Sequence, residues 1–121
     1  MLKVENLCVS YGYITALSGV SFEVGQGEIV TLIGSNGAGK STSLMAISNL
    51  VAKESGTVTF KGVDISKMTP SKIVNMGMSH VPEGRHIFPS LSVYENLIAG
   101  SIGNPKMTKA QICLLYRSWR W

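Results

Sequence analysis

The residue types in this chain that are best suited to chemistry gather in one glycine-rich run, residues 34–42, with the sequence Gly-Ser-Asn-Gly-Ala-Gly-Lys-Ser-Thr. The run fits the pattern G-x-x-x-x-G-K-[ST], the Walker A phosphate loop. Its glycines let the backbone turn tightly and bring N–H groups close to an anion. A helix beginning after the loop would add a partial positive charge at its first turn. The spacing therefore predicts binding of a nucleoside triphosphate.

The three residues after the last glycine have separate roles in this predicted site. Lys40 supplies a point charge for the β- and γ-phosphates. The Ser41 hydroxyl is a ligand for Mg²⁺, and Thr42 can donate to the α-phosphate. The predicted cofactor-binding residues of the loop are Gly34, Ser35, Asn36, Gly37, Ala38, Gly39, Lys40, Ser41 and Thr42. A glycine-rich turn that happens to precede a lysine is the alternative.

The segments on either side of the loop are those that a phosphate loop needs. Residues 28–33 are apolar and rich in β-branched side chains, which predicts a buried strand. Residues 40 to about 50 carry a helical pattern without a breaker. Earlier in the chain, residues 2–9 and 15–24 predict two strands, the second irregular at Gly19. The pattern indicates an α/β fold of the phosphate-loop NTPase class.

Further elements are predicted after the loop. They are a strand at residues 57–60, a hairpin turn at 61–64, a helix from Pro70 to Asn75 or Met76, a strand at 78–81 and a helix that begins after Ser92 and runs to about Ala99. Thr69 before Pro70 is a helix start signal. Ser92 and Glu95 have the spacing of a capping box.

Composition narrows the class of protein. The chain has 121 residues, which is one small domain or part of a larger one. Its net charge of +4 suits an anionic ligand. The lysines and arginines form no basic block, so no nucleic-acid partner is predicted. No apolar stretch reaches the ~18 residues of a membrane span, and the N-terminus lacks a signal peptide. Cys8 and Cys113 are far apart and predict reduced thiols in a cytosolic protein.

Residues 111–121 differ from the rest of the chain. Trp119 and Trp121 both lie in the last three positions, and the segment has no cap and no clear polar face. A basic aromatic tail could contact a membrane or a nucleic acid. We favour a tail that does not belong to the fold, as a premature stop or frameshift would produce. The predicted regions are therefore residues 1–110, which contain the loop, and an atypical tail at 111–121.

Residues 1 to about 105 resemble the ATP-binding subunit of ABC transporters. Besides the loop, the segments that carry the resemblance are Tyr11-Gly12, residues 16–22, residues 55–58 with 62–65, and residues 81–97. Residues 81–85, Val-Pro-Glu-Gly-Arg, are the most specific. Most members carry a glutamine at the position of Glu83, in the Q-loop, and the glutamate is typical of the group that serves branched-chain amino acid uptake.

The resemblance implies a fold and two more site residues. The fold is an incomplete ABC ATPase domain with an N-terminal antiparallel β subdomain. Tyr11 would stack on adenine, and Glu83 would lie near the γ-phosphate and Mg²⁺. The implied cofactors are ATP and Mg²⁺, with Ser41 and Glu83 as the metal ligands. A surface tyrosine in a turn and a glutamate in a loop are the alternatives.

The function implied by the resemblance is that of an ATP-binding subunit of an importer, for branched-chain amino acids, which couples ATP binding and hydrolysis to transport. The implied partners are a second ATPase subunit and transmembrane permease subunits. The implied location is cytoplasmic, peripheral at the inner face of the cell membrane.

The family's signature loop, Walker B aspartate, catalytic glutamate and switch histidine have no counterpart in these 121 residues. No catalytic set is complete, and we do not expect hydrolysis by this chain alone. We expect a fragment with exposed apolar edges. Two alternatives stay open. One is an inactive truncated fragment that retains at most nucleotide binding, and the other is a different small phosphate-loop NTPase, such as a kinase or GTPase.

Overall fold

The computed structural model describes residues 1–84, 87–102, 108 and 111 of the chain. They belong to two compact units, Met1–Ile73 and Val74–Trp121. The phosphate loop lies in the first unit and the segment around Glu83 lies in the second. Each unit is described by itself below.

The first unit contains a four-stranded antiparallel sheet in the order β2-β1-β3-β4. Its strands are β1 (Leu2–Tyr11), β2 (Ile14–Val24), β3 (Ser55–Phe60) and β4 (Val63–Asp64). Tight turns join β1 to β2 and β3 to β4. The second turn has Lys61 at φ 51° and Gly62 at φ 80°, the pair of positive angles that a two-residue hairpin favours. The predicted strands at 2–9, 15–24 and 57–60 and the turn at 61–64 are confirmed.

The pairing of β1 with β2 shifts register at three places, between Val4 and Leu7, between Leu7 and Val9 and between Val9 and Ser10. In β1, Asn6 has φ 49°, and its N–H donates to Ser21 Oγ at 2.8 Å. In β2, Gly19 has φ 68°, and its N–H donates to Cys8 Sγ at 3.2 Å. Positive φ at Gly19 confirms the predicted irregularity, because glycine adopts this angle without a steric penalty.

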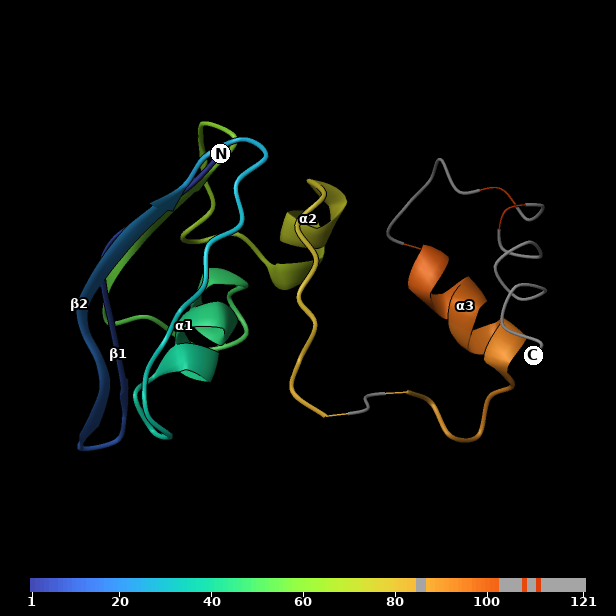
Figure 1. Cartoon of the computed structure of the whole chain (residues 1–121), viewed down its shortest axis with the longest axis horizontal. Helices are drawn as coiled ribbons and strands as arrows, with labels where there is room; N and C mark the ends of the chain where they lie inside the picture. Colours follow the sequence, from blue (N-terminus) through green and yellow to red (C-terminus); the bar gives the residue numbers. More distant parts are fainter. Residues whose placement is uncertain (85–86, 103–107, 109–110, 112–121) are drawn as a thin grey trace. The chain divides into compact units, whose positions relative to one another are not determined.

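Helix α1 (Lys40–Ile47) packs on the sheet, as Figure 1 shows. The helix is shorter than the predicted span of residues 40–50. Helix α2 (Pro70–Asn75) begins at the predicted proline. The core combines strand, helix and loop residues, namely Val4, Leu7, Val9, Leu17, Ala46, Ile47, Val58, Phe60, Ile65 and Ile73. Burial of these side chains is the main force that holds α1 and the sheet together.

The prediction of a buried strand at residues 28–33 is wrong. The segment forms no strand in the structure, and the side chains of Ile29 and Ile33 are 97% and 93% exposed. A strand needs a hydrogen-bonded neighbour, and no described strand pairs with this segment. The apolar pattern marks residues suited to burial, but this unit does not supply the surface that would bury them.

The second unit contains helix α3 (Val93–Ser101). The predicted capping box is confirmed: Ser92 Oγ accepts from the N–H of Glu95, and Glu95 Oε2 accepts from the N–H of Ser92 at 2.7 Å. Asn96 bonds back to the preceding loop, where its Nδ2 donates to the carbonyl oxygens of Phe88, Leu91 and Ser92.

The prediction of a strand at residues 78–81 is wrong, because these residues form no ladder with any described segment and Val81 is 86% exposed. Cys8 is a free thiol in β1. Cys113 and the tail beyond Gln111 lie outside the described residues, so the division into 1–110 and 111–121 stays a prediction. Within the described residues, none of the helices has the length and apolar character needed to cross a membrane.

Candidate functional site

The N-terminal end of α1 has the properties of an anion site. Its N-cap residue is Gly39, in the left-handed region at φ 82°, ψ 8°, and it makes no side-chain cap hydrogen bond. No acidic residue lies in the first turn. The first N–H groups of a helix have no acceptor within the helix, so an anion placed here would supply the acceptor and meet the positive end of the helix dipole.

Close contact with β2 fixes Gly39 in place. A Cβ atom at this position would lie 2.5 Å from Leu17 Cδ2 and 2.8 Å from the carbonyl oxygen of Ala16. Both distances are far below van der Waals contact, so no larger residue fits without displacement of β2. The fold thus requires glycine at position 39, and the residue types of the loop fit a phosphate group.

The side chain of Lys40 curls over this loop. Its Nζ donates to the carbonyl oxygens of Gly34 and Ser35 at 2.7 and 2.6 Å. The ammonium therefore lies beside the first two residues of the loop. A charge held there by backbone carbonyls can attract a triphosphate without a large rearrangement of the loop.

The rest of the loop is open to an incoming ligand. Its chain reverses at a turn in which the Ala38 N–H donates to the Ser35 carbonyl oxygen at 3.2 Å. Residues 34–38 and Ser41 are exposed, whereas Lys40 and Thr42 are half-buried. Ser43, by contrast, is buried and its hydroxyl donates to the Gly39 carbonyl oxygen at 2.9 Å. The Ser41 hydroxyl is therefore better placed than that of Ser43 to meet a metal ion.

Tyr11 lies at the end of β1, opposite Ile14 in the turn to β2, and is 47% exposed. The residues of β2 that contact Gly39 follow Ile14 by two and three positions, which is roughly 7–10 Å along a strand. Figure 1 shows this turn and the phosphate loop toward the same end of the sheet. An exposed ring at this end is a suitable platform for a base.

Glu83 lies in the second unit, in a bend after Pro82, and is exposed. Its predicted contact with the γ-phosphate and Mg²⁺ stays a prediction. Arg85 and His86, which follow in the resemblance, lie outside the described residues.

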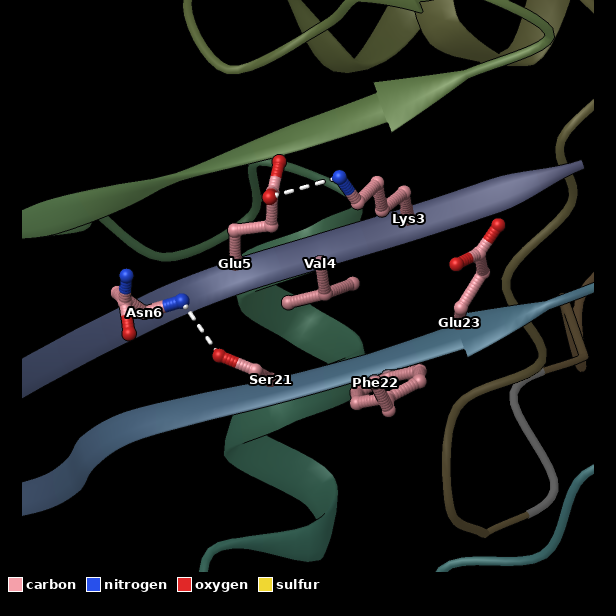
Figure 2. Close-up of a pocket in the computed structure, with 7 residues that line it drawn as sticks. All are labelled: Lys3, Val4, Glu5, Asn6, Ser21, Phe22 and Glu23. Carbon is pink, nitrogen blue, oxygen red and sulfur yellow. Dashed lines mark hydrogen bonds and ion pairs between the residues drawn. The ribbon is translucent and has the colours of Figure 1, made fainter.

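Apart from the phosphate loop, a hollow with a volume of about 320 Å³ lies over β1 and β2 (Figure 2). It is lined by Lys3, Val4, Glu5, Asn6, Ser21, Phe22 and Glu23. Lys3 Nζ pairs with Glu5 Oε1 at 2.8 Å, and the hydrogen bond from this pair raises the pKa of Lys3. Two carboxylates against one ammonium make the hollow unsuited to a triphosphate. Within the described part of the chain, no group of three or more acidic, His or Cys side chains could hold a metal ion.

The sequence does not indicate every residue that shapes the loop. Leu17 is 22 positions from Gly39, and nothing in the local pattern connects the two. Asn49, which follows α1, is another residue that the motif does not include. Its position after a helix is a known signal for a left-handed cap, but its side-chain partners become visible only in the folded chain.

Comparison with known proteins agrees with this geometry. A sequence model of a protein family described as ABC transporter matches residues 17–119. The high-affinity branched-chain amino acid transport ATP-binding protein BraG of Pseudomonas aeruginosa is 43% identical over 106 residues, which are 88% of this chain and 46% of that protein. The lipopolysaccharide export system ATP-binding protein LptB of Haemophilus influenzae is 39% identical over 99 residues, 82% of this chain and 41% of that protein.

A solved structure of an ATP-binding cassette of an ABC transporter in its ADP conformation has the same fold, with a TM-score of 0.75 and 31% identity. The similarity covers 98% of this chain and 46% of the cassette. The chain thus spans about half the length of the relatives it matches. The match of a family model to most of the chain, on a fold that carries the loop, shows that the chain belongs to the ABC transporter family.

Proposed function

We propose that this chain contributes the nucleotide-binding part of an ABC transporter ATP-binding subunit, with MgATP as the ligand of residues 34–42. The observation that supports it most is the loop itself, where Gly39 is pressed against β2 and Lys40 is folded over two loop carbonyls. In this proposal Lys40 contacts the β- and γ-phosphates, the Ser41 hydroxyl binds Mg²⁺ and Thr42 contacts the α-phosphate. Tyr11 supplies the face on which adenine stacks, and Glu83 acts near the γ-phosphate.

The cargo proposed is branched-chain amino acids. Support comes from the Val-Pro-Glu-Gly-Arg segment at 81–85 and from the similarity to BraG. The lipopolysaccharide export protein LptB is nearly as similar. The assignment of branched-chain amino acids as the cargo therefore rests on fewer residues than the assignment of a nucleotide as the ligand. In the whole protein a second ATPase subunit and membrane permease subunits would be the partners, at the cytoplasmic face of the membrane.

Hydrolysis is not proposed for the 121 residues alone. Phosphoryl transfer needs groups that orient water and stabilise charge at the transition state. Neither a Walker B aspartate nor a glutamate after it is found in this sequence. ATP binding without turnover is the activity that the chain can be tested for.

The test is calorimetric titration of the purified chain with MgATP. We expect a dissociation constant in the millimolar range or tighter, about −4 kcal/mol. Lys40→Ala should abolish binding, because it removes the charge that faces the phosphates. Lys72→Ala, an exposed lysine of α2, changes the net charge equally and should leave binding unchanged.

Absence of binding in a chain whose circular dichroism shows the folded sheet would overturn the nucleotide proposal. It would favour instead an inactive fragment. Equal loss of affinity in Lys40→Ala and Lys72→Ala would mean that the chain attracts the nucleotide by net charge rather than through the loop.

A further inference from the structure

The end of α1 opposite to the phosphate loop is fixed by a side chain that the motif does not include. After the last helical residue, Ile47, the chain turns through Asn49 at φ 55°. The Leu50 N–H donates to the Met45 carbonyl oxygen at 2.9 Å, and the Asn49 N–H donates to the Ala46 carbonyl oxygen at 3.2 Å. These two bonds form a Schellman motif, which most often places glycine at the left-handed position.

Asparagine at this position brings an amide that glycine lacks. Asn49 Nδ2 donates to the carbonyl oxygens of Ile65 and Met68, at 2.8 and 2.6 Å. These carbonyls belong to the segment between β4 and α2. Asn49 Oδ1 accepts from Lys53 Nζ, which also donates to the Ala46 carbonyl oxygen at 3.1 Å. We call this set of contacts the Asn49 clamp; it ties the C-terminal end of α1 to two other segments.

The clamp is half-buried, and this strengthens its contribution. Both Asn49 and Lys53 are shielded in part from water, and burial lowers the pKa of Lys53. Hydrogen bonds in such surroundings are costly to break, because the released carbonyls would be left without full hydration. The C-terminal end of α1 therefore resists rotation and sliding more strongly than a helix end capped by backbone bonds alone.

The helix carries this restraint to the loop. An eight-residue helix is about 12 Å long and moves as a rigid element. Its N-terminal end is held by the contact of Gly39 with β2, and its other end by the Asn49 clamp. Two fixed points determine the direction in which the first-turn N–H groups of α1 point. Small changes in such geometry alter electrostatic binding strongly.

We propose that Asn49 is a positioning residue for the phosphate site: it fixes the axis and rotation of α1 from the far end and so sets the affinity of the loop for a triphosphate, without contacting it. The inference rests on the proposed nucleotide function of residues 34–42. A purely structural Asn49 would change stability and leave the affinity of the folded chain unaltered.

The test compares Asn49→Gly with Ile73→Val in the full chain. Glycine keeps the left-handed backbone and removes only the amide. Ile73 is a buried residue of α2, and its shortening weakens the core without removing a hydrogen bond of the clamp. The probe is inorganic tripolyphosphate with Mg²⁺, titrated by calorimetry at a temperature where circular dichroism shows both variants folded. We expect at least a fivefold rise in dissociation constant for Asn49→Gly and less than a twofold change for Ile73→Val.

A second variant, Asn49→Asp, keeps an oxygen for Lys53 but turns a carboxylate toward the carbonyls of Ile65 and Met68. It should weaken binding at least as much as Asn49→Gly. If both Asn49 variants bind tripolyphosphate within twofold of the unaltered chain, the clamp has no positioning role. If the unaltered chain fails to bind MgATP, the proposed function falls and this inference falls with it. If the unaltered chain binds MgATP and tripolyphosphate and the Asn49 variants bind equally well, only this inference falls.

Discussion

Leu17 Cδ2 lies 2.5 Å from the point where a Cβ atom on Gly39 would stand. Strand β2 and the last glycine of the loop are thus in contact with no room for a methyl group. The phosphate loop is shaped by the sheet on which it rests as well as by its own sequence. Because Gly39 lies against the sheet and Gly37 does not, substitutions can distinguish the roles of these two glycines.

Gly39→Ala should destabilise the chain more than Gly37→Ala. Both glycines have positive φ, 82° and 85°, so either alanine carries a backbone cost of about 1–2 kcal/mol. Only Gly39 has neighbours in the way, since nothing lies within 4 Å of a Cβ at Gly37. Overpacking adds about 1–3 kcal/mol. Urea unfolding of the two variants measures the difference, and equal midpoints would contradict the contact with β2.

Tyr11→Ala should weaken ATP binding about 5- to 150-fold, the range for loss of one base–aromatic stack of about 1–3 kcal/mol. Affinity for tripolyphosphate should not change, because that ligand has no base. Tyr11→Phe should retain affinity for ATP. Tyr13→Ala is the matched control from the same turn, where the ring is fully exposed. A parallel loss of ATP and tripolyphosphate binding would show that Tyr11 acts on the loop rather than on adenine.

Ile33→Ala should change the free energy of unfolding by less than about 0.5 kcal/mol, as for other exposed positions. Ile65→Ala should cost about 2–5 kcal/mol, because the Ile65 side chain is fully buried. Chemical unfolding of the 121-residue chain provides both values. A large loss for Ile33→Ala would indicate that residues 28–33 are covered in solution, contrary to their 93–97% exposed isoleucines.

Ser92→Ala should loosen the first turn of α3, with a cost of about 1 kcal/mol for the lost cap. Hydrogen bonds from Ser92 to the Glu95 carboxylate lower the pKa of Glu95. Because the pKa of Glu95 is lower in the folded chain than in the unfolded chain, its hydrogen bonds stabilise the folded state fully above the ordinary glutamate pKa. This stabilisation is lost as the pH falls below about 4. The protection of amides 93–96 from exchange, corrected for the intrinsic rate at each pH, should therefore fall in acid in the parent chain, and Ser92→Ala should reduce that pH dependence, since only the backbone N–H of residue 92 would still donate to the Glu95 carboxylate.

Local features account for most of what could be predicted from the sequence. The capping box at Ser92, the helix start at Pro70 and the hairpin at 61–64 depend on residues within a few positions of each other, and the structure contains all three. The phosphate loop is local in the same sense. A β-strand is not local in this sense, because it forms only when a neighbouring strand is present to pair with it. Residues 28–33 have the composition of a strand, but that composition cannot say whether the neighbour is present.

Long-range contacts could not be predicted for a related reason. The approach of Leu17 to Gly39 and the bonds of Asn49 to Ile65 and Met68 join segments 16 to 22 positions apart. They depend on how α1 lies on the sheet, which no motif encodes. The placement of Tyr11 and Glu83 came from family resemblance, and the structure describes them in separate units.

The exposed apolar segment at 28–33 has a consequence for the chain during its synthesis. All pairings of the four-stranded sheet lie within residues 2–64, so that sheet can form early, since domains fold from the N-terminus as the chain emerges. Residues 28–33 would then leave the ribosome extended, apolar and without a hydrogen-bonded neighbour. Such a segment is a natural binding site for a holding chaperone, and its occupancy would keep nascent chains from pairing with one another.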